Sequence, residues 1–166
     1  MTAGLVHIPM EVDAPLRSVS DPEIPVLSIL DMGVVRAVEL VGKQVHVKIT
    51  PTYSGCPAMD MIAAEIKMAL DMAGFNSEVE LVLSPAWTTD WLTPEGRRKL
   101  EEYGIAAPLE DSADKLALMG QSRMVECPHC ESKNTRMVSQ FGSTACKALF
   151  QCNDCLEPFD YFKCLK

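Results

Sequence analysis

The sequence predicts an α/β (α+β) fold in which a small mixed sheet carries helices packed on one face. Three observations lead to this class. Residues 44–50 alternate between apolar and polar side chains, as a half-buried strand does. Residues 59–70 repeat apolar side chains at helical spacing, and residues 77–84 return to a strand pattern. A small sheet covered by helices is the natural way to bury these faces.

The remaining elements of this first domain follow from local signals. A short helix is expected over residues 14–19, and residues 34–40 form a hairpin with residues 44–50. The long helix ends near Met72, because Gly74 is typical of a helix C-terminus. Thr93 and Pro94 fit the cap and first position of a further helix, which ends at Gly104.

Composition excludes several classes of function. The chain has 166 residues and a formal net charge of −8, which argues against nucleic-acid and anionic-membrane partners. No apolar run has the length of a membrane span, and no signal peptide is visible. The odd number of cysteines, seven, favours a reducing cytoplasm over a disulfide scaffold.

Two Cys-x-x-Cys pairs carry the clearest chemical signal. Their spacing, roughly twenty residues apart, is typical of a four-cysteine zinc site, and the segment between them alternates like two short strands. Two such pairs on a hairpin predict a C-terminal zinc ribbon. The alternative is a set of reduced dithiols or disulfides, although neither pair opens a helix as a redox motif would. The expected ligands are Cys127, Cys130, Cys152 and Cys155.

A closed shell of four sulfurs leaves no open position for water, so the metal is expected to be structural and the ribbon to serve as a docking or scaffold element. Cys146 and Cys164 are additional thiols that either replace a ligand or stay free. The predicted domains are residues 1–106, a linker over 107–122 with Pro108 and mixed charge, and the ribbon over 123–166.

Cys56 is the candidate reactive residue of the first domain. Pro57 suits the first helical position, which makes Cys56 the expected N-cap and exposes its thiol to free backbone N–H groups that favour thiolate. Asp60 in the first turn opposes this effect by like-charge repulsion. The alternative is a buried structural cysteine.

Two further loops hold candidate residues with equally open alternatives. Asp21 and Glu23 lie close together in a loop set by two prolines, and they are either site carboxylates or ordinary loop acids. Trp87 and Trp91 share another loop, where they belong either to the core or to a binding surface.

Several motifs resemble a known family along nearly the whole chain. Residues 21–25, 28–33, 51–57 and the loop around Trp87 resemble the iron–sulfur cluster assembly domain of SufT and the cytosolic iron–sulfur targeting proteins. Residues 84–92, 103–105 and the cysteine ribbon through residue 164 are similar to the PaaD (PaaJ) family of phenylacetate degradation. Residues 105–108 depart from the family, where a double proline is expected.

The resemblance implies a non-enzymatic, cytoplasmic maturation factor for the metal centres of the multicomponent phenylacetyl-CoA epoxidase. It implies structural zinc and leaves open a transient iron–sulfur cluster. The expected partners are the epoxidase components, especially the iron–sulfur reductase, and the iron–sulfur assembly machinery. The residues implied to be reactive or to contact the cluster or client are Cys56, Asp21, Glu23, Thr52 and Trp87.

The competing interpretation is a non-catalytic structural subunit of the phenylacetyl-CoA oxygenase complex. A catalytic subunit is disfavoured, because the sequence lacks the Glu and Glu-x-x-His pairs that hold a di-iron centre on long helices. It also lacks a flavin or nicotinamide fingerprint.

Overall fold

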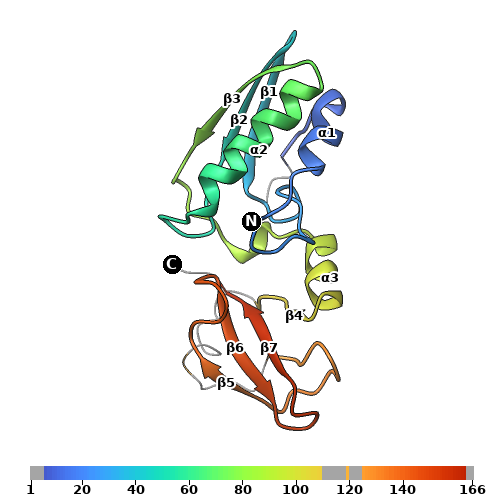
Figure 1. Cartoon of the computed structure of the whole chain (residues 1–166), viewed down its shortest axis with the longest axis vertical. Helices are drawn as coiled ribbons and strands as arrows, with labels where there is room; N and C mark the ends of the chain where they lie inside the picture. Colours follow the sequence, from blue (N-terminus) through green and yellow to red (C-terminus); the bar gives the residue numbers. More distant parts are fainter. Residues whose placement is uncertain (1–5, 110–118, 120–124, 164–166) are drawn as a thin grey trace. The chain divides into compact units, whose positions relative to one another are not determined.

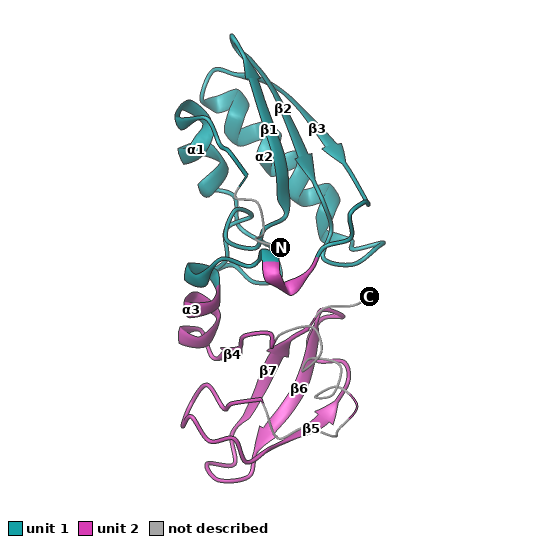
Figure 2. Ribbon diagram, turned by 180° about the vertical axis from the view of Figure 1, so that it is seen from behind, with its two compact units in different colours: residues 1–87, 91–96 teal, residues 88–90, 97–166 magenta. Residues whose placement is uncertain are grey.

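A computed structural model describes residues 6–109, 119 and 125–163. The chain divides into two compact units, which Figure 2 colours separately. The first contains residues 1–87 and 91–96, and the second contains residues 88–90 and 97–166. Within the described residues, no helix combines the length and apolarity that crossing a bilayer requires.

A three-stranded mixed sheet forms the framework of the first unit. Its strands are β1 (Val35–Val41), β2 (Gln44–Ile49) and β3 (Asn76–Leu81), in the order β1-β2-β3. β1 and β2 form the predicted antiparallel hairpin, and β3 lies parallel to β2. The parallel pair requires a crossover, which α2 (Ala58–Met72) provides. The predicted mixed sheet is therefore confirmed.

The core of this unit lies between the sheet and its helices. α2 runs across one face of the sheet and α1 (Met10–Arg17) lies beside it (Figure 1). The apolar positions of β2 alternate inward as predicted, and α2 contributes every third or fourth side chain. The fully buried members include Leu16, Val45, Val47, Ile49, Ile62, Ile66 and Leu70.

The first helix differs from the prediction. It begins at Met10, four residues before the expected start at residue 14, and it ends at Arg17. Pro15 lies inside it, and proline is normally a helix terminator because it lacks a backbone N–H. In so short a helix the proline removes a single backbone bond. The burial of Val12 and Leu16 against the core favours the helical conformation.

The signals around α3 (Pro94–Glu102) are confirmed. The backbone N–H of Gly96 donates to Thr93 Oγ1 at 2.9 Å, the cap expected from the Thr-Pro sequence. Gly104, at a φ of 88°, follows the helix. A 3-10 turn, η1 (Thr89–Trp91), precedes it.

A four-stranded sheet organises the second unit. Its strands are β4 (Ile105–Ala106), β5 (Thr135–Ser139), β6 (Lys147–Cys152) and β7 (Pro158–Phe162), in the order β4-β7-β6-β5. The predicted β5–β6 hairpin is present. β7 pairs antiparallel with β6, and the short β4 pairs parallel with β7.

The compact units divide the chain earlier than the boundary expected after residue 106. Residues 97–106 group with the ribbon, because β4 joins its sheet through Ile105↔Asp160 and Ala106↔Tyr161. At the start of the predicted linker, the N–H of Leu109 donates to Tyr161 Oη at 3.1 Å. Most of the linker, residues 110–118 and 120–122, lies outside the described residues.

Candidate functional site: a four-cysteine centre and a thiol loop

Four cysteine sulfurs converge in the second unit. The ligand atoms of Cys127, Cys130, Cys152 and Cys155 all lie within 4.8 Å of one another. Cys127 Sγ lies 3.8 Å from Cys155 Sγ, and Cys130 Sγ lies 3.5 Å from Cys152 Sγ. Four sulfurs bound tetrahedrally at about 2.3 Å from a zinc ion are about 3.8 Å apart. The donor set and its spacing therefore fit one tetrahedral metal ion.

The backbone around each cysteine pair explains this convergence. Glu131 follows the first pair with a φ of 62°, and Leu156 follows the second with a φ of 67°. The backbone therefore turns in the left-handed conformation directly after the second cysteine of each pair. Backbone N–H groups of Cys155 and Asp154 point at Cys152 Sγ, at 3.5 and 3.4 Å, and lower its pKa to about 7. These bonds favour the metal-binding thiolate at Cys152, whereas the pKa values of Cys130 and Cys155 are raised.

A polar network ties the two cysteine loops together. Asp154, between the cysteines of the second pair, accepts hydrogen bonds from Ser132 Oγ and from Asn134 Nδ2, the latter at 2.8 Å. These bonds hold the pKa of the Asp154 carboxyl below its usual value. Asn153 also donates its backbone N–H to the carbonyl of Asn134 at 2.8 Å. Protein contacts therefore hold the two cysteine loops next to each other.

The extra cysteines have different placements. Cys146 is buried in the segment between β5 and β6, with its sulfur 3.1 Å from Thr144 Oγ1, and it does not join the four-cysteine group. Cys164 lies outside the described residues.

Cys56 lies in the loop between β2 and α2. The loop turns at Gly55, whose φ is 80°, and the Cys56 N–H donates to the carbonyl of Tyr53 at 3.2 Å. The helix begins at Ala58, one residue later than expected, and Pro57 occupies the cap with helical angles. Cys56 is thus the last residue outside the helical conformation, and its thiol is half-buried.

The environment raises the pKa of the Cys56 thiol, contrary to the thiolate-favouring effect expected of a helix start. Burial is the largest cause. The Ala58 N–H and the Tyr53 hydroxyl act in the opposite direction, and the charges of Glu23 and Asp21 add to the increase. The structure therefore brings both predicted carboxylates near Cys56, and they, rather than the expected Asp60, supply the opposing charge.

Asp21 also has a structural role in its own loop. Its Oδ1 accepts hydrogen bonds from the N–H groups of Glu23 and Ile24, at 2.7 and 2.9 Å. Ser20 and Ser28 pair as an isolated bridge that closes the loop. The side chain of Asp21 is almost fully buried, whereas Glu23 is half-buried.

The other two predicted site residues, Thr52 and Trp87, differ in how far they are buried. Thr52 is half-buried in the Cys56 loop. Trp87 is only 2% exposed, and its indole Nε1 donates to the carbonyl of Met32 at 2.9 Å. Its placement is that of a core residue that anchors a loop, and its predicted contact with a client stays a prediction.

Two residues of the segment that leads to Cys56 were not singled out from the sequence. Tyr53 contacts the thiol, as described above. Thr50, at the end of β2, is 1% exposed, and its Oγ1 finds no hydrogen-bond partner among the described residues. A buried, unpaired hydroxyl is costly, so it marks this end of the strand as unusual. No periodicity signal distinguishes either side chain.

Two family models match the two segments that contain the Cys56 loop and the four cysteines. A family model described as an iron–sulfur cluster assembly protein matches residues 4–81, and one described as the PaaD zinc beta ribbon domain matches residues 111–163. An Escherichia coli protein, named as a putative subunit of 1,2-phenylacetyl-CoA epoxidase, is 49% identical over 156 residues, covering 93% of this chain and 92% of that protein. The chain belongs to the PaaD family.

Other similar proteins match about half of this PaaD-family chain. A Porphyromonas gingivalis protein named "Fe-S protein maturation auxiliary factor" is 34% identical over 89 residues, which cover 51% of this chain and 83% of that protein. A crystal structure of a domain of unknown function, DUF59, from Bacillus anthracis aligns with 26% identity and a TM-score of 0.49, covering 52% of this chain and 85% of that one.

Proposed function

We propose that this chain is an accessory maturation factor that assists assembly of the iron–sulfur or other metal centres of a multicomponent phenylacetyl-CoA epoxidase. One observation carries the proposal. A single chain joins an iron–sulfur assembly-type domain, with Cys56 in a turn before a helix, to a four-cysteine ribbon that aligns with the E. coli epoxidase subunit. The name of the Porphyromonas gingivalis relative supports the same role. The chain acts on other proteins and is not itself an enzyme.

Cys56 suits a transient hold on metal. Its raised pKa keeps the thiol protonated at neutral pH, which protects it from alkylation and oxidation. A soft metal ion displaces that proton, because the metal binds the thiolate. Iron–sulfur clusters usually have four protein ligands, so one thiol provides only part of a shell. The cluster is therefore cargo shared with ligands of a client or an assembly protein.

The ribbon is proposed to hold structural zinc and to dock the client. Its closed sulfur shell leaves no position for substrate, and the metal supplies folding free energy to a small sheet. Free zinc-binding thiols persist in a reducing compartment, which favours the cytoplasm as the place of this function.

The test is client metallation. The epoxidase components are co-expressed with the wild-type chain, Cys56→Ala or the matched control Ser54→Ala, an exposed residue of the same loop. Iron and acid-labile sulfide are then measured in the purified iron–sulfur reductase. Lower metal content with Cys56→Ala alone, with its fold intact by circular dichroism, supports the role. Equal metallation in all three samples refutes the role of Cys56.

A non-catalytic structural subunit is the second candidate, because the E. coli relative is named as a subunit of the complex. This candidate predicts stoichiometric co-purification with the working epoxidase. It also predicts that the assembled complex loses activity when the chain is stripped from it. A maturation factor instead leaves full activity behind once the client is metallated.

A further inference from the structure

A cavity of about 330 Å³ lies in the first unit, apart from the Cys56 loop. Its wall comes from α1, the turn before β1, the first residues of β1 and the segment from Trp91 to Thr93. A volume of this size is within the range of small-ligand sites. No residue of the Cys56 loop lines it, so it is separate from the site described above.

Arg36 is the distinctive cation in this cavity. Its guanidinium carbon lies 3.5 Å from the centroid of the Trp91 ring, so the indole covers one face and the N–H donors remain at the edge. Among the described residues, no carboxylate forms an ion pair with Arg36, and burial lowers its pKa. A half-buried arginine of this kind gains from an anion that accepts its planar pair of donors.

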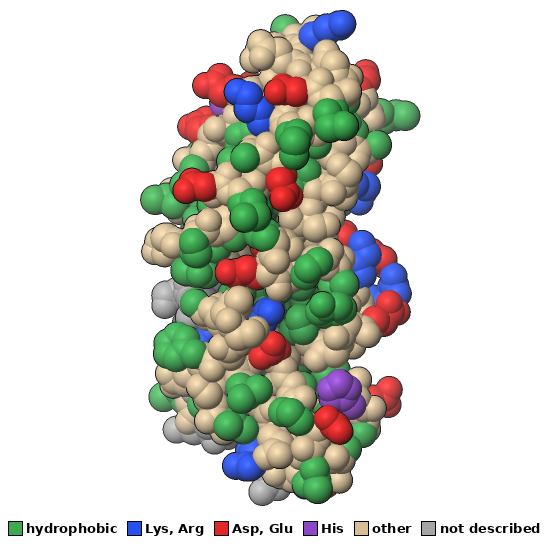
Figure 3. Space-filling model, in the orientation of Figure 1, with side chains coloured by type: hydrophobic (Ala, Val, Ile, Leu, Met, Phe, Trp, Pro, Cys, Tyr) green, Lys and Arg blue, Asp and Glu red, His purple; other side chains and the backbone are tan. Residues whose placement is uncertain are grey.

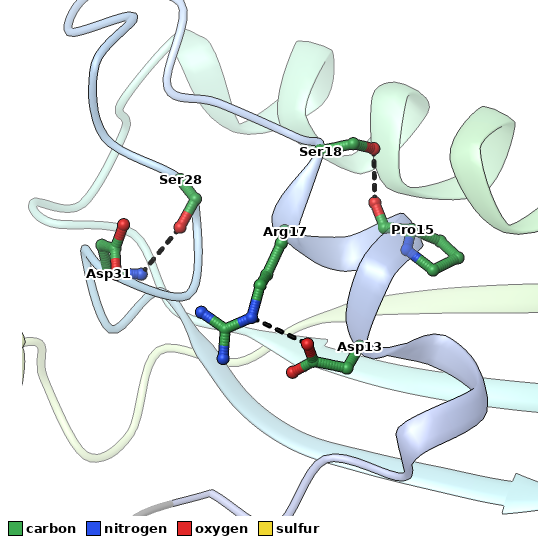
Figure 4. Close-up of polar contacts among 6 residues, drawn as sticks. All are labelled: Asp13, Pro15, Arg17, Ser18, Ser28 and Asp31. Atoms are coloured by element: carbon green, nitrogen blue, oxygen red, sulfur yellow. Dashed lines mark hydrogen bonds and ion pairs between the residues drawn. The ribbon is translucent and has the colours of Figure 1, made fainter.

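The second guanidinium in the wall is already neutralised. Arg17 donates through Nε to Asp13 Oδ2 at 2.7 Å, and Figure 4 shows its guanidinium beside that carboxylate. The buried carboxylate of Asp31 also lines the cavity and accepts a hydrogen bond from Thr93 Oγ1 at 3.2 Å. The carboxylate of Asp31 thus faces the same space as Arg36, and it would repel a doubly charged phosphate more strongly than a singly charged ligand.

The rest of the wall is apolar. Ile8, Leu30 and Val35 line it together with the Trp91 ring, and they can cover the body of a small hydrophobic molecule. We propose that this cavity binds a monocarboxylate with a compact apolar or aromatic body, whose carboxylate pairs with Arg36. A carboxylate next to an apolar body occurs in free organic acids and at the C-terminal residue of a polypeptide. The inference does not depend on the proposed function.

Isothermal titration calorimetry of the full, metal-loaded chain tests the inference. The probes are 3-phenylpropanoate, a glycine- and serine-rich pentapeptide ending in phenylalanine with a free carboxylate, and the amidated forms of both. At least one free carboxylate should bind at millimolar concentration, and its amide should bind about tenfold to a hundredfold more weakly, as for a lost hydrogen bond to a charged group. Tighter binding of the acid or of the peptide identifies which source the site takes.

Variants make the result specific to Arg36. Arg36→Met keeps the length of the side chain, removes the charge and should weaken carboxylate binding about tenfold or more. Arg36→Lys keeps the charge without the planar pair of donors, so its affinity for the carboxylate should lie between those of the wild type and Arg36→Met. Arg98→Met, which removes an exposed cation outside the cavity, is the matched control and should bind normally. Melting curves check that each variant is folded.

The inference is overturned by any of three results. The first is that neither carboxylate probe binds to the wild-type chain. The second is that the amides bind as tightly as the acids. The third is that Arg36→Met or Arg36→Lys, whichever of them is folded, binds the carboxylate as tightly as the wild type. Tighter binding of inorganic phosphate than of either carboxylate would also overturn it.

Discussion

The indole Nε1 of Trp87 donates a hydrogen bond to the carbonyl oxygen of Met32 at 2.9 Å, and both residues are 2% exposed. The bond joins the segment after β3 to the loop before β1. Both loops adjoin the elements that carry the candidate site residues. An indole N–H that is fully used inside the protein indicates that the ring fixes the loops of this unit.

Trp87→Phe should therefore destabilise the first unit by about 1–3 kcal/mol, because the buried Met32 carbonyl loses its donor. Urea unfolding followed by circular dichroism measures the change. Trp91→Phe is the control: this ring is half-buried, and the smaller ring still stacks on Arg36. Equal losses for both variants would contradict the assigned role. Lower client metallation without lost stability would instead support the predicted client contact of Trp87.

Cys56 should react slowly with iodoacetamide at neutral pH. Burial and the charges of Glu23 and Asp21 raise its pKa, so the thiolate fraction at pH 7 is below that of a free cysteine, whose pKa is about 8.5. Mass spectrometry of the loop peptide across a pH series gives the midpoint of reactivity, which should lie above that of free cysteine measured in the same way.

Two substitutions should move this midpoint in opposite directions. Glu23→Gln removes a negative charge and should lower the pKa of Cys56, whereas Tyr53→Phe removes a hydrogen-bond donor to the sulfur and should raise it. A midpoint below the free-cysteine value, or a shift of either variant in the reverse direction, would show that the thiol lies in a different environment.

Removal of the metal should unfold the ribbon and leave the first unit folded. The four sulfurs lie together without a disulfide, and without a metal ion they repel one another as thiolates or take up protons, so the bonds that join the two cysteine loops are lost. Hydrogen exchange after treatment with a chelator should show lost protection in β5, β6 and β7 and retained protection in β2 and α2. Cys127→Ser should mimic the chelator, and Cys146→Ala should retain the metal. Simultaneous loss of protection in both units would contradict this separation.

Glu131 provides a test of the turn geometry in the first cysteine loop. Glycine adopts the φ of 62° at this position without strain, whereas a β-branched residue adopts this angle at the greatest cost in free energy. Glu131→Gly should change stability by less than about 1 kcal/mol, and Glu131→Val should reduce it by about 1–3 kcal/mol. Thermal melts of the metal-loaded protein compare the two, and a melting temperature for Glu131→Val at or above that of Glu131→Gly would contradict the left-handed turn.

Sequence reasoning succeeded where one residue type has one strong physical preference. Alternating Val45, Val47 and Ile49 can bury a single face only as a strand, and Thr93 followed by Pro94 has few uses other than a helix start. The convergence of the ribbon cysteines was equally predictable, because their spacing and chemistry point to one metal ion.

Hydrophobic and acidic side chains are mixed over the face that carries α2 (Figure 3), in keeping with the acidic composition.

The sequence was less informative where long-range contacts decide. Ile105 and Ala106 form a strand only because β7, more than fifty residues later, supplies the partner. The first helix begins four residues before the expected start, because burial of Val12 and Leu16 favours the helical conformation on both sides of Pro15. The pKa of Cys56 depends on burial and on Asp21 and Glu23, which reach it from another loop. None of these effects has a local pattern.

The pairing of β4 with β7 affects where the chain can be cut to isolate the ribbon. A fragment that starts at residue 107 would leave one side of β7 with unsatisfied backbone groups, an invitation to self-association. One that starts at residue 97 retains the two-residue strand as a cover. The ribbon is therefore better isolated from the earlier cut, although its cysteines begin thirty residues downstream of it.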